Sequence, residues 1–427
     1  MLIILTICSL SVYCRAFISR SAFLHTPNLV ASAYLFFLIP QMFAFQALDL
    51  ERAVLDPNAY YWALVYAVMC LFASFLGWRS GSISFLSRFL CRFNDRVSGK
   101  TLFTAMLALS LISNLAAYRF EQLKGSFDHA DAGSQQLTGT GTKILFVARI
   151  VYIPYAYFLS EFLQRKSFKN FALLFSTIFL TCQRVITGGR RSPLALLSLP
   201  LLCMLFFRKR ITLNRALIAF ILIAPLVLLP ALAVLRFGFW SSLFQGEVDF
   251  VFIQRTLTEY FTEAYPHDFL NAVNIIALTT DRLYFGLGSG FWNDLVFNFV
   301  PAQFLGNNFK DFLYIDISPV SYLKNFELNQ YFTYKLGTTQ TGLGNTFAEF
   351  SFLGSLCFFV QSKIMRTLWD VSMLGKELAM VAYCFMATSV FLSITHGFYY
   401  FINYAFLLIV IFCFCQVLSL KLFTKTA

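Results

Sequence analysis

YYFINYAFLLIVIFCFCQVLSL, residues 399–420, carries no charged side chain over a stretch long enough to cross a lipid bilayer as one helix. Apolar runs like this recur along the 427-residue chain, in which 58% of the residues are hydrophobic and only 13% are charged. Soluble globular proteins have about 25% charged residues. The composition therefore predicts an all-α polytopic integral membrane protein.

The apolar runs predict about eleven transmembrane helices. They lie at 2–14, 29–48, 59–77, 102–118, 144–163, 170–187, 193–207, 216–235, 345–362, 378–395 and 399–420. The first run lacks a basic preceding segment and an A-x-A-like cleavage site, so we interpret it as a span rather than a signal peptide. This organisation predicts an N-terminal bundle of about eight helices at 1–235, one large loop at 236–344 and about three closing helices at 345–427.

Lysine and arginine gather in alternate loops, which the positive-inside rule assigns to the cytoplasm. These residues are Arg15, Arg20, Arg79, Arg88, Arg92, Arg96, Lys100, Arg165, Lys166, Lys169, Arg208, Lys209, Arg210, Arg215, Lys363, Arg366, Lys376, Lys421 and Lys425. The remaining loops are acidic or mixed. The alternation predicts a periplasmic N-terminus and a cytoplasmic C-terminus. It also accounts for the formal charge of +12 as a sorting signal, so no nucleic acid is expected as a partner.

The long loop at 236–344 is too apolar and aromatic to be a disordered linker. Residues 251–265 are spaced as an amphipathic helix, and a second helix is expected to begin near Pro266. The glycine-interrupted stretch 284–305 is apolar enough to lie in the membrane interface or to re-enter the membrane. We therefore expect a compact extracytoplasmic cap over the bundle.

The turn TGGRRSP at 187–193 places Arg190 and Arg191 on the side that the positive-inside rule keeps poor in arginine. One interpretation is that they are interfacial arginines bound to lipid headgroups. The other is an anion-binding site, because guanidinium groups pair with phosphate oxygens and stay charged. Arg149 and Arg184 lie within predicted spans, where ionisable residues are functional candidates unless they pair with acids.

Candidate proton acceptors are few. His267 and Asp268 are adjacent and base-like, but the same pair also suits a solvated helix start. His396, at the outer end of a predicted span, suits either a base or packing, and Glu349 suits either structural pairing or catalysis. The ten cysteines lie mostly in apolar runs without CxxC spacing, so neither a metal site nor a cofactor is expected.

Three stretches resemble the Wzy-type polymerases, which join repeat units of O-antigen or capsular polysaccharide. The T-G-G-R turn followed by leucines resembles the glycine–arginine turn of that family. YFGLGSGFW…FVPAQF in the long loop resembles its glycine-containing stretch followed by a phenylalanine–proline element. NTFAEFSFLGSL resembles its segment of a glutamate, aromatic residues and a glycine that opens the next span. The span count and the single large outer loop are similar as well.

The resemblance implies glycosyl transfer at the periplasmic face of the bacterial inner membrane. The growing glycan would pass from undecaprenyl pyrophosphate to the next lipid-linked unit, with membrane lipids and a chain-length regulator protein as further partners. Pyrophosphate-binding candidates are Arg190, Arg191, Arg184, Arg236 and Arg282; base candidates are His267, Asp268 and Glu349; sugar-stacking candidates are Tyr260, Tyr265, Trp292 and Tyr322. An O-antigen ligase and a lipid-linked oligosaccharide flippase or other transporter remain alternatives.

Overall fold

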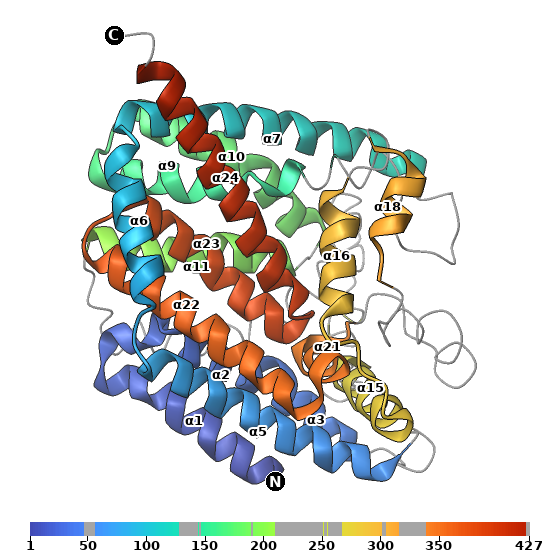
Figure 1. The fold of residues 1–427 in the computed structure, drawn as a ribbon. Helices are drawn as coiled ribbons and strands as arrows, with labels where there is room; N and C mark the ends of the chain where they lie inside the picture. Colours follow the sequence, from blue (N-terminus) through green and yellow to red (C-terminus); the bar gives the residue numbers. More distant parts are fainter. Residues whose placement is uncertain are drawn as a thin grey trace.

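The computed structural model describes residues 1–46, 56–127, 144, 147–188, 191–209, 251, 254, 267–300, 305–315 and 339–423. All regular secondary structure in these residues is helical, so the all-α expectation is confirmed for the described part of the chain (Figure 1). Of the predicted apolar runs, 216–235 lies outside the described residues, as does most of the predicted helix 251–265.

Six described helical stretches are long and apolar enough to cross a membrane. They are Thr26–Phe45, Asn58–Arg79, Gly99–Phe120, Thr341–Met373, Glu377–Thr395 and Tyr399–Ser419, and shorter apolar helices lie at Leu2–Ile18, Phe168–Phe179 and Leu194–Arg208. This set defines the class of the protein as a multi-pass helical membrane protein. The larger number of spans stays a prediction.

The helices follow one another along the chain with short connections. In order they are α1 (Leu2–Ile18), η1 (Arg20–Leu24), α2 (Thr26–Ala33), the π-helical η2 (Tyr34–Leu38), α3 (Ile39–Gln46), α5 (Pro57–Arg79), α6 (Ser84–Arg96), α7 (Gly99–Phe127), α9 (Tyr152–Gln164), α10 (Phe168–Gly188), α11 (Arg191–Lys209), α15 (His267–Arg282), α16 (Ser289–Phe299), α18 (Asn307–Leu313), α21 (Thr341–Phe350), η4 (Ser351–Gly354), α22 (Ser355–Met373), α23 (Glu377–Thr395) and α24 (Tyr399–Phe423).

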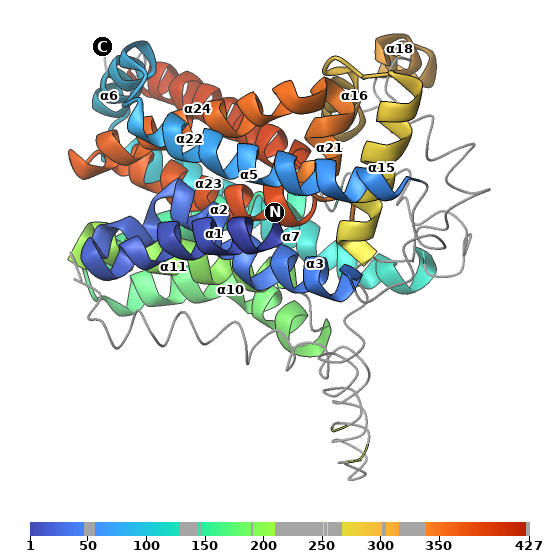
Figure 2. The same cartoon turned by 90° about the horizontal axis from the view of Figure 1, so that it is seen from below.

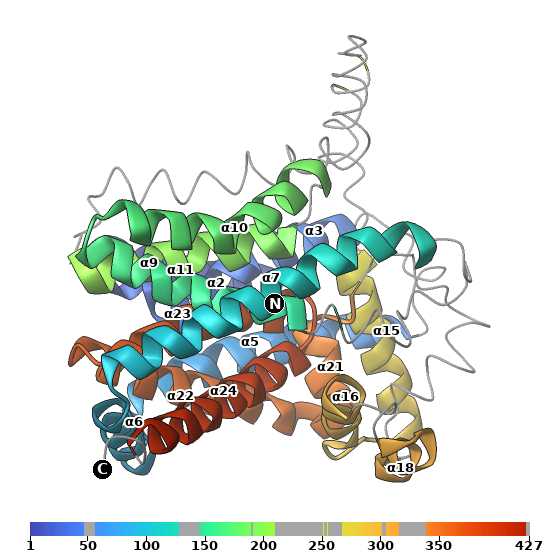
Figure 3. The same cartoon turned by 90° about the horizontal axis from the view of Figure 1, so that it is seen from above.

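The long helices run between two ends of the bundle, on the left and right of Figure 1. The end that carries Arg15, Arg79, Arg208 and Lys376 is called the basic end here. The opposite end, where α15, α16 and α18 lie, is called the loop end (Figures 1 and 2). Helix α10 runs from the basic end toward the opposite end of the bundle (Figure 3), and α11 begins three residues after α10 ends.

Helix α23 is the centre of the bundle. Its apolar window is 94% buried, and it packs against α2, α9, α11, α22 and α24. Small residues let the neighbouring helices approach closely: a Cβ at Gly342 of α21 would lie 2.1 Å from the Ser393 carbonyl oxygen of α23. Gln361 Nε2 of α22 donates a hydrogen bond to Ser393 Oγ at 2.8 Å, so α22 also contacts α23 at this serine. Such small-residue contacts and interhelical hydrogen bonds are the means by which helices associate in lipid.

The structure differs from the predicted runs at three places. The run 144–163 is interrupted by a turn at 150–151, and α9 begins just before Pro154, whose missing N–H suits a first helical turn. The run 345–362 is broken between α21 and α22 by the short helix η4, where Ser351 has a φ of 54°. The basic segment 84–96 forms the amphipathic helix α6, which the apolar runs did not indicate.

Candidate functional site

Backbone strain is concentrated at the loop end. Four described residues other than glycine have positive φ: Leu283, Leu287, Thr341 and Ser351, with φ of 50–56°. They flank α15, α16 and α21, and Thr341 is both β-branched and fully buried. Left-handed backbone of this kind costs about 1–3 kcal/mol per residue and is commonly held at functional sites. The strained residues therefore favour a functional site at the loop end.

Glu349 holds the start of α16. Its carboxylate oxygen Oε2 accepts hydrogen bonds from the amides of Gly288 at 2.9 Å and Gly290 at 3.2 Å. Gly286 leaves the space that this carboxylate fills, because a Cβ there would lie 2.3 Å from the same oxygen. An acid at a helix N-terminus satisfies the first amides and complements the helix dipole. The structure thus shows Glu349 in a positioning role, and its catalytic role stays a prediction.

Asp268 also positions a segment of chain. Its oxygen Oδ1 accepts hydrogen bonds from the backbone amide and the hydroxyl of Thr339, the latter at 3.0 Å. The Thr339 hydroxyl contacts the carbonyl oxygen of Thr395 at 2.7 Å. Asp268 therefore connects the start of α15 to the end of α23 through Thr339. It lies most of the length of α21 away from Glu349, so these two acids do not form one pair.

His396 follows directly at the end of α23. Its Nδ1 lies 2.8 Å from the hydroxyl of Thr395, and the same hydroxyl lies 3.2 Å from the Phe391 carbonyl oxygen. The hydroxyl has one proton for these two acceptors, so the contact fixes the position of the imidazole ring and not its tautomer. The ring lies edge-on to Tyr400, with centroids 5.4 Å apart. His396 is thus held in place by Thr395 and Tyr400.

Arg149 lies among tyrosines at the same end. Its guanidinium interacts electrostatically with the phenol groups of Tyr152, Tyr399, Tyr400 and Tyr404, which come from α9 and α24. No ion pair joins Arg149 to an acid in the described part of the chain. Glu161, the acid on α9, lies nine residues beyond Tyr152, about 14 Å along the helix at 1.5 Å per residue. Arg149, the four tyrosines and His396 are called the Arg149 cluster here.

The structure describes some of the other predicted site residues and leaves others outside the described part. Arg282 is exposed in the last turn of α15, and Trp292 donates from Nε1 to the Leu313 carbonyl at 2.8 Å, which ties α16 to α18. Arg184, Arg191 and His267 lie in α10, α11 and α15, but their side chains are outside the described part. Arg190, Arg236, Tyr260, Tyr265 and Tyr322 lie entirely outside the described residues.

The sequence reasoning singled out Arg149 and His396 but not the tyrosines that join them. The available signal is the spacing of Tyr400 and Tyr404, which places both on one face of α24, close behind His396 in the chain. Comparison of the chain with family models, with curated proteins and with solved structures gives no match. The class of multi-pass helical membrane protein and the loop-end geometry are therefore the basis for a functional proposal.

Proposed function

We propose that this protein is a polymerase of lipid-linked oligosaccharide repeat units, acting at the periplasmic face of the bacterial inner membrane. The donor is a growing glycan on undecaprenyl pyrophosphate, and the acceptor is one lipid-linked repeat unit. The sequence resemblance motivates the reaction class. The loop end of the bundle supplies the physical support, since it combines non-spanning helices, strained backbone and a cation set among hydroxyl groups.

The observation that carries the proposal is the Arg149 cluster. A guanidinium at membrane depth is costly unless it is compensated, and in the described residues tyrosine hydroxyls take the place of a carboxylate. Neutral neighbours leave the positive charge available to an anion. Arg190 lies outside the described residues and remains a second candidate for the pyrophosphate from the sequence resemblance.

The proposed reaction needs three functions from the protein. The acceptor hydroxyl oxygen attacks the anomeric carbon of the donor sugar, the bond from that carbon to the pyrophosphate oxygen breaks, and the lipid pyrophosphate leaves with the bonding electrons. Arginines offset the charge that develops on the leaving group. A base accepts the proton of the attacking hydroxyl. Side chains that fix the two sugars bring the oxygen and carbon together.

His396 is the base that we propose. A neutral imidazole has one nitrogen that accepts a proton, and the ring is held in place by Thr395. Asp268 acts behind it as a positioning residue, because it holds the Thr339 segment that contacts the Thr395 carbonyl. Glu349 positions α16, which carries the sugar-stacking candidate Trp292.

The test is a surface-polysaccharide gel from a deletion strain complemented with variants of the gene. Wild type is expected to restore the full ladder, while Arg149→Gln, Arg190→Ala and His396→Gln leave a single repeat unit on the lipid core. Arg119→Gln is the matched control, because Arg119 is an exposed arginine on α7 whose hydrogen bond in the described part of the chain goes to its neighbour Gln122.

Each outcome separates the function classes. A deletion strain with single repeat units on the core supports a polymerase. If no repeat unit reaches the core, a ligase or a flippase replaces the proposal. A ladder that is unchanged by the deletion removes the polysaccharide assignment altogether.

A further inference from the structure

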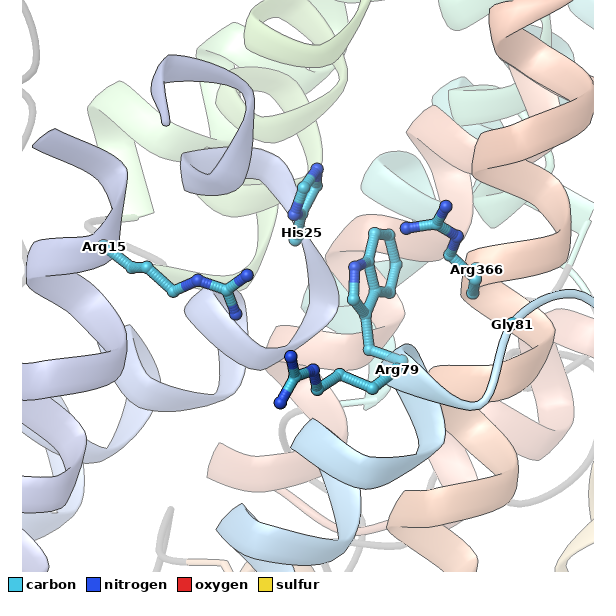
Figure 4. Close-up of a pocket in the computed structure, with 6 residues that line it drawn as sticks. Arg15, His25, Arg79, Gly81 and Arg366 are labelled. Carbon is cyan, nitrogen blue, oxygen red and sulfur yellow. The ribbon is translucent and has the colours of Figure 1, made fainter. Parts of the chain in front are cut away.

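A pocket at the basic end collects three arginines from distant parts of the chain. It has a volume of about 270 Å³ and is lined by Arg15 of α1, His25 before α2, Trp78 and Arg79 of α5, Gly81, and Arg366 of α22. Figure 4 shows Arg15 and Arg79 extending toward the same space from two helices, with His25 beside it and Arg366 approaching from α22. The pocket is far from the Arg149 cluster, which lies at the other end of the bundle.

Of the three arginines that line the pocket, two have no acidic partner in the part of the chain that the structure describes. Arg366 is paired with Asp370 at 2.9 Å, one turn further along α22. Arg15 and Arg79 have no ion pair in the described part of the chain. Both instead lie against one ring, with their guanidinium carbons 5.5 and 5.4 Å from the centroid of Phe75. Two guanidinium groups held near one ring repel each other, and an anion between them offsets that repulsion.

The positive charge of the pocket also affects the pKa of His25. Burial, followed by the charges of Arg366 and Arg15, lowers the pKa of the His25 imidazole from 6.5 to about 3. The ring therefore stays neutral and offers one N–H donor at physiological pH. It is held in place by Trp78, stacked at 4.6 Å, and by Trp369, edge-on at 4.8 Å. The wall of the pocket is thus a rigid aromatic frame that presents hydrogen-bond donors.

The helix dipole accounts for an arginine at the end of each helix, but not for two such side chains that point into one cavity. Arg15 and Arg79 both lie in the last turn of their helices, where a cation complements the helix dipole. An arginine that points into solvent complements the helix dipole equally well, as the exposed Arg96 does in the last turn of α6. Here the side chains turn toward a shared cavity. The cavity is open beside Gly81, where an added Cβ would meet no atom within 4 Å.

We infer that this pocket, called the Arg15 pocket here, binds a phosphate group between Arg15 and Arg79, with Arg366 completing the charge. Guanidinium groups match phosphate oxygens through paired hydrogen bonds. The pocket lies where the membrane helices α1 and α5 end, on the side that the positive-inside rule assigns to the cytoplasm. Two sources present a phosphate there: the headgroup of an anionic phospholipid and free inorganic phosphate.

The experiment measures thermal unfolding of the full-length protein in neutral detergent. The three additions are inorganic phosphate, short-chain phosphatidylglycerol, and short-chain phosphatidylcholine, whose choline offsets the phosphate charge; sodium chloride matches the ionic strength. Phosphatidylglycerol is expected to raise the unfolding temperature of the wild type by several degrees, because a ligand that binds only the folded state stabilises it. The same rise with inorganic phosphate identifies a site for free phosphate, and its absence identifies a lipid headgroup site.

Two double variants test the location. Arg15→Gln/Arg79→Gln removes both unpaired cations and is expected to abolish the rise. Arg88→Gln/Arg92→Gln removes the same charge from exposed positions on α6 at the same end and is expected to keep it. The ligand-free Arg15→Gln/Arg79→Gln protein is expected to be at least as stable as wild type, since repulsion is relieved. If it does not fold, Arg79→Gln alone is measured and is expected to weaken binding about tenfold.

The inference is overturned if neither phosphate nor phosphatidylglycerol stabilises the wild type. It is also overturned if both double variants lose the effect equally, because the rise would then reflect the overall charge of the basic end. These results are independent of the polysaccharide gel, so failure of the Arg15 pocket proposal can be distinguished from failure of the proposed function.

Discussion

Gly342→Ala is expected to destabilise the crossing of α21 over α23. The new Cβ would lie 2.1 Å from the Ser393 carbonyl oxygen, whereas ordinary contact begins at 3.4 Å, so the helices must separate by about 1.3 Å. The obstacle is main chain of the most buried helix, which cannot rotate away as a side chain can. The same crossing positions Thr339 against Thr395, so a shift there also displaces His396.

The magnitude follows from two opposing effects. Overpacking costs about 1–3 kcal/mol, and a backbone obstacle in a buried helix favours the upper value. Alanine regains about 0.5–1 kcal/mol, because glycine loses more conformational freedom on folding. The net loss is therefore about 2 kcal/mol. A shift of about 1–2 °C per kcal/mol suits a chain of this length, so the unfolding temperature should fall by about 2–4 °C.

The assay is thermal unfolding in detergent with a fluorogenic thiol dye, which reports exposure of the buried Cys70, Cys203, Cys384 and Cys415. The matched control is Gly99→Ala at the start of α7, where an added Cβ meets no atom within 4 Å. This control should unfold at the wild-type temperature or slightly above. If Gly342→Ala unfolds at or above the temperature of the control, the close helix crossing is refuted.

Three further changes test other parts of the structure. Glu377 Oε1 lies 2.6 Å from the half-buried Arg208 guanidinium, so Glu377→Gln leaves that charge without its acid and should lower the free energy of unfolding by about 3 kcal/mol. Asp370→Asn breaks the more exposed ion pair with Arg366 and should lower it by less than about 0.5 kcal/mol. Burial and the charges of Arg366 and Arg15 lower the pKa of His25 to about 3 in the folded protein. Below pH 6.5, His25 is therefore protonated in the unfolded chain but stays neutral in the folded chain, which favours unfolding. Stability should therefore fall by about 2 kcal/mol between pH 7 and pH 5, and a His25→Gln variant whose unfolding shows the same pH dependence would contradict this cause. Thr341→Gly, which relieves a β-branched residue at a φ of 56°, should unfold at or above the wild-type temperature; a clear decrease would show that the threonine contacts outweigh the strain.

Much of the fold could be predicted from local sequence. A run such as 399–420 must form a helix in a membrane, because its backbone groups find no water there and bond within the segment. Breaks in runs were harder to predict. Nothing local to 345–362 shows that Gly354 packs against the Thr346 carbonyl and the Tyr66 hydroxyl, where the chain changes direction between α21 and α22.

The candidate sites depended less on local pattern. Arg149 and His396 are separated by some 250 residues, and only the tertiary structure brings the Tyr400 ring near both. Glu349 is compatible with catalysis from its position in the sequence, yet the structure turns its carboxylate onto the amides of α16. A polar side chain in a buried helix takes whichever partner its neighbours present, and spacing along one helix does not specify that partner.

The sequence by itself determined the membrane class, the helical architecture of the described residues and the alternation of basic loops, because these follow from hydrophobicity and charge summed along each segment. Only the tertiary structure decided that Arg15, Arg79 and Arg366 face one pocket. Each is an ordinary basic residue at the end of a helix when considered alone. Their convergence arises from helices α1, α5 and α22 packing side by side, and contacts between segments so far apart in sequence are specified by the shape of the whole bundle.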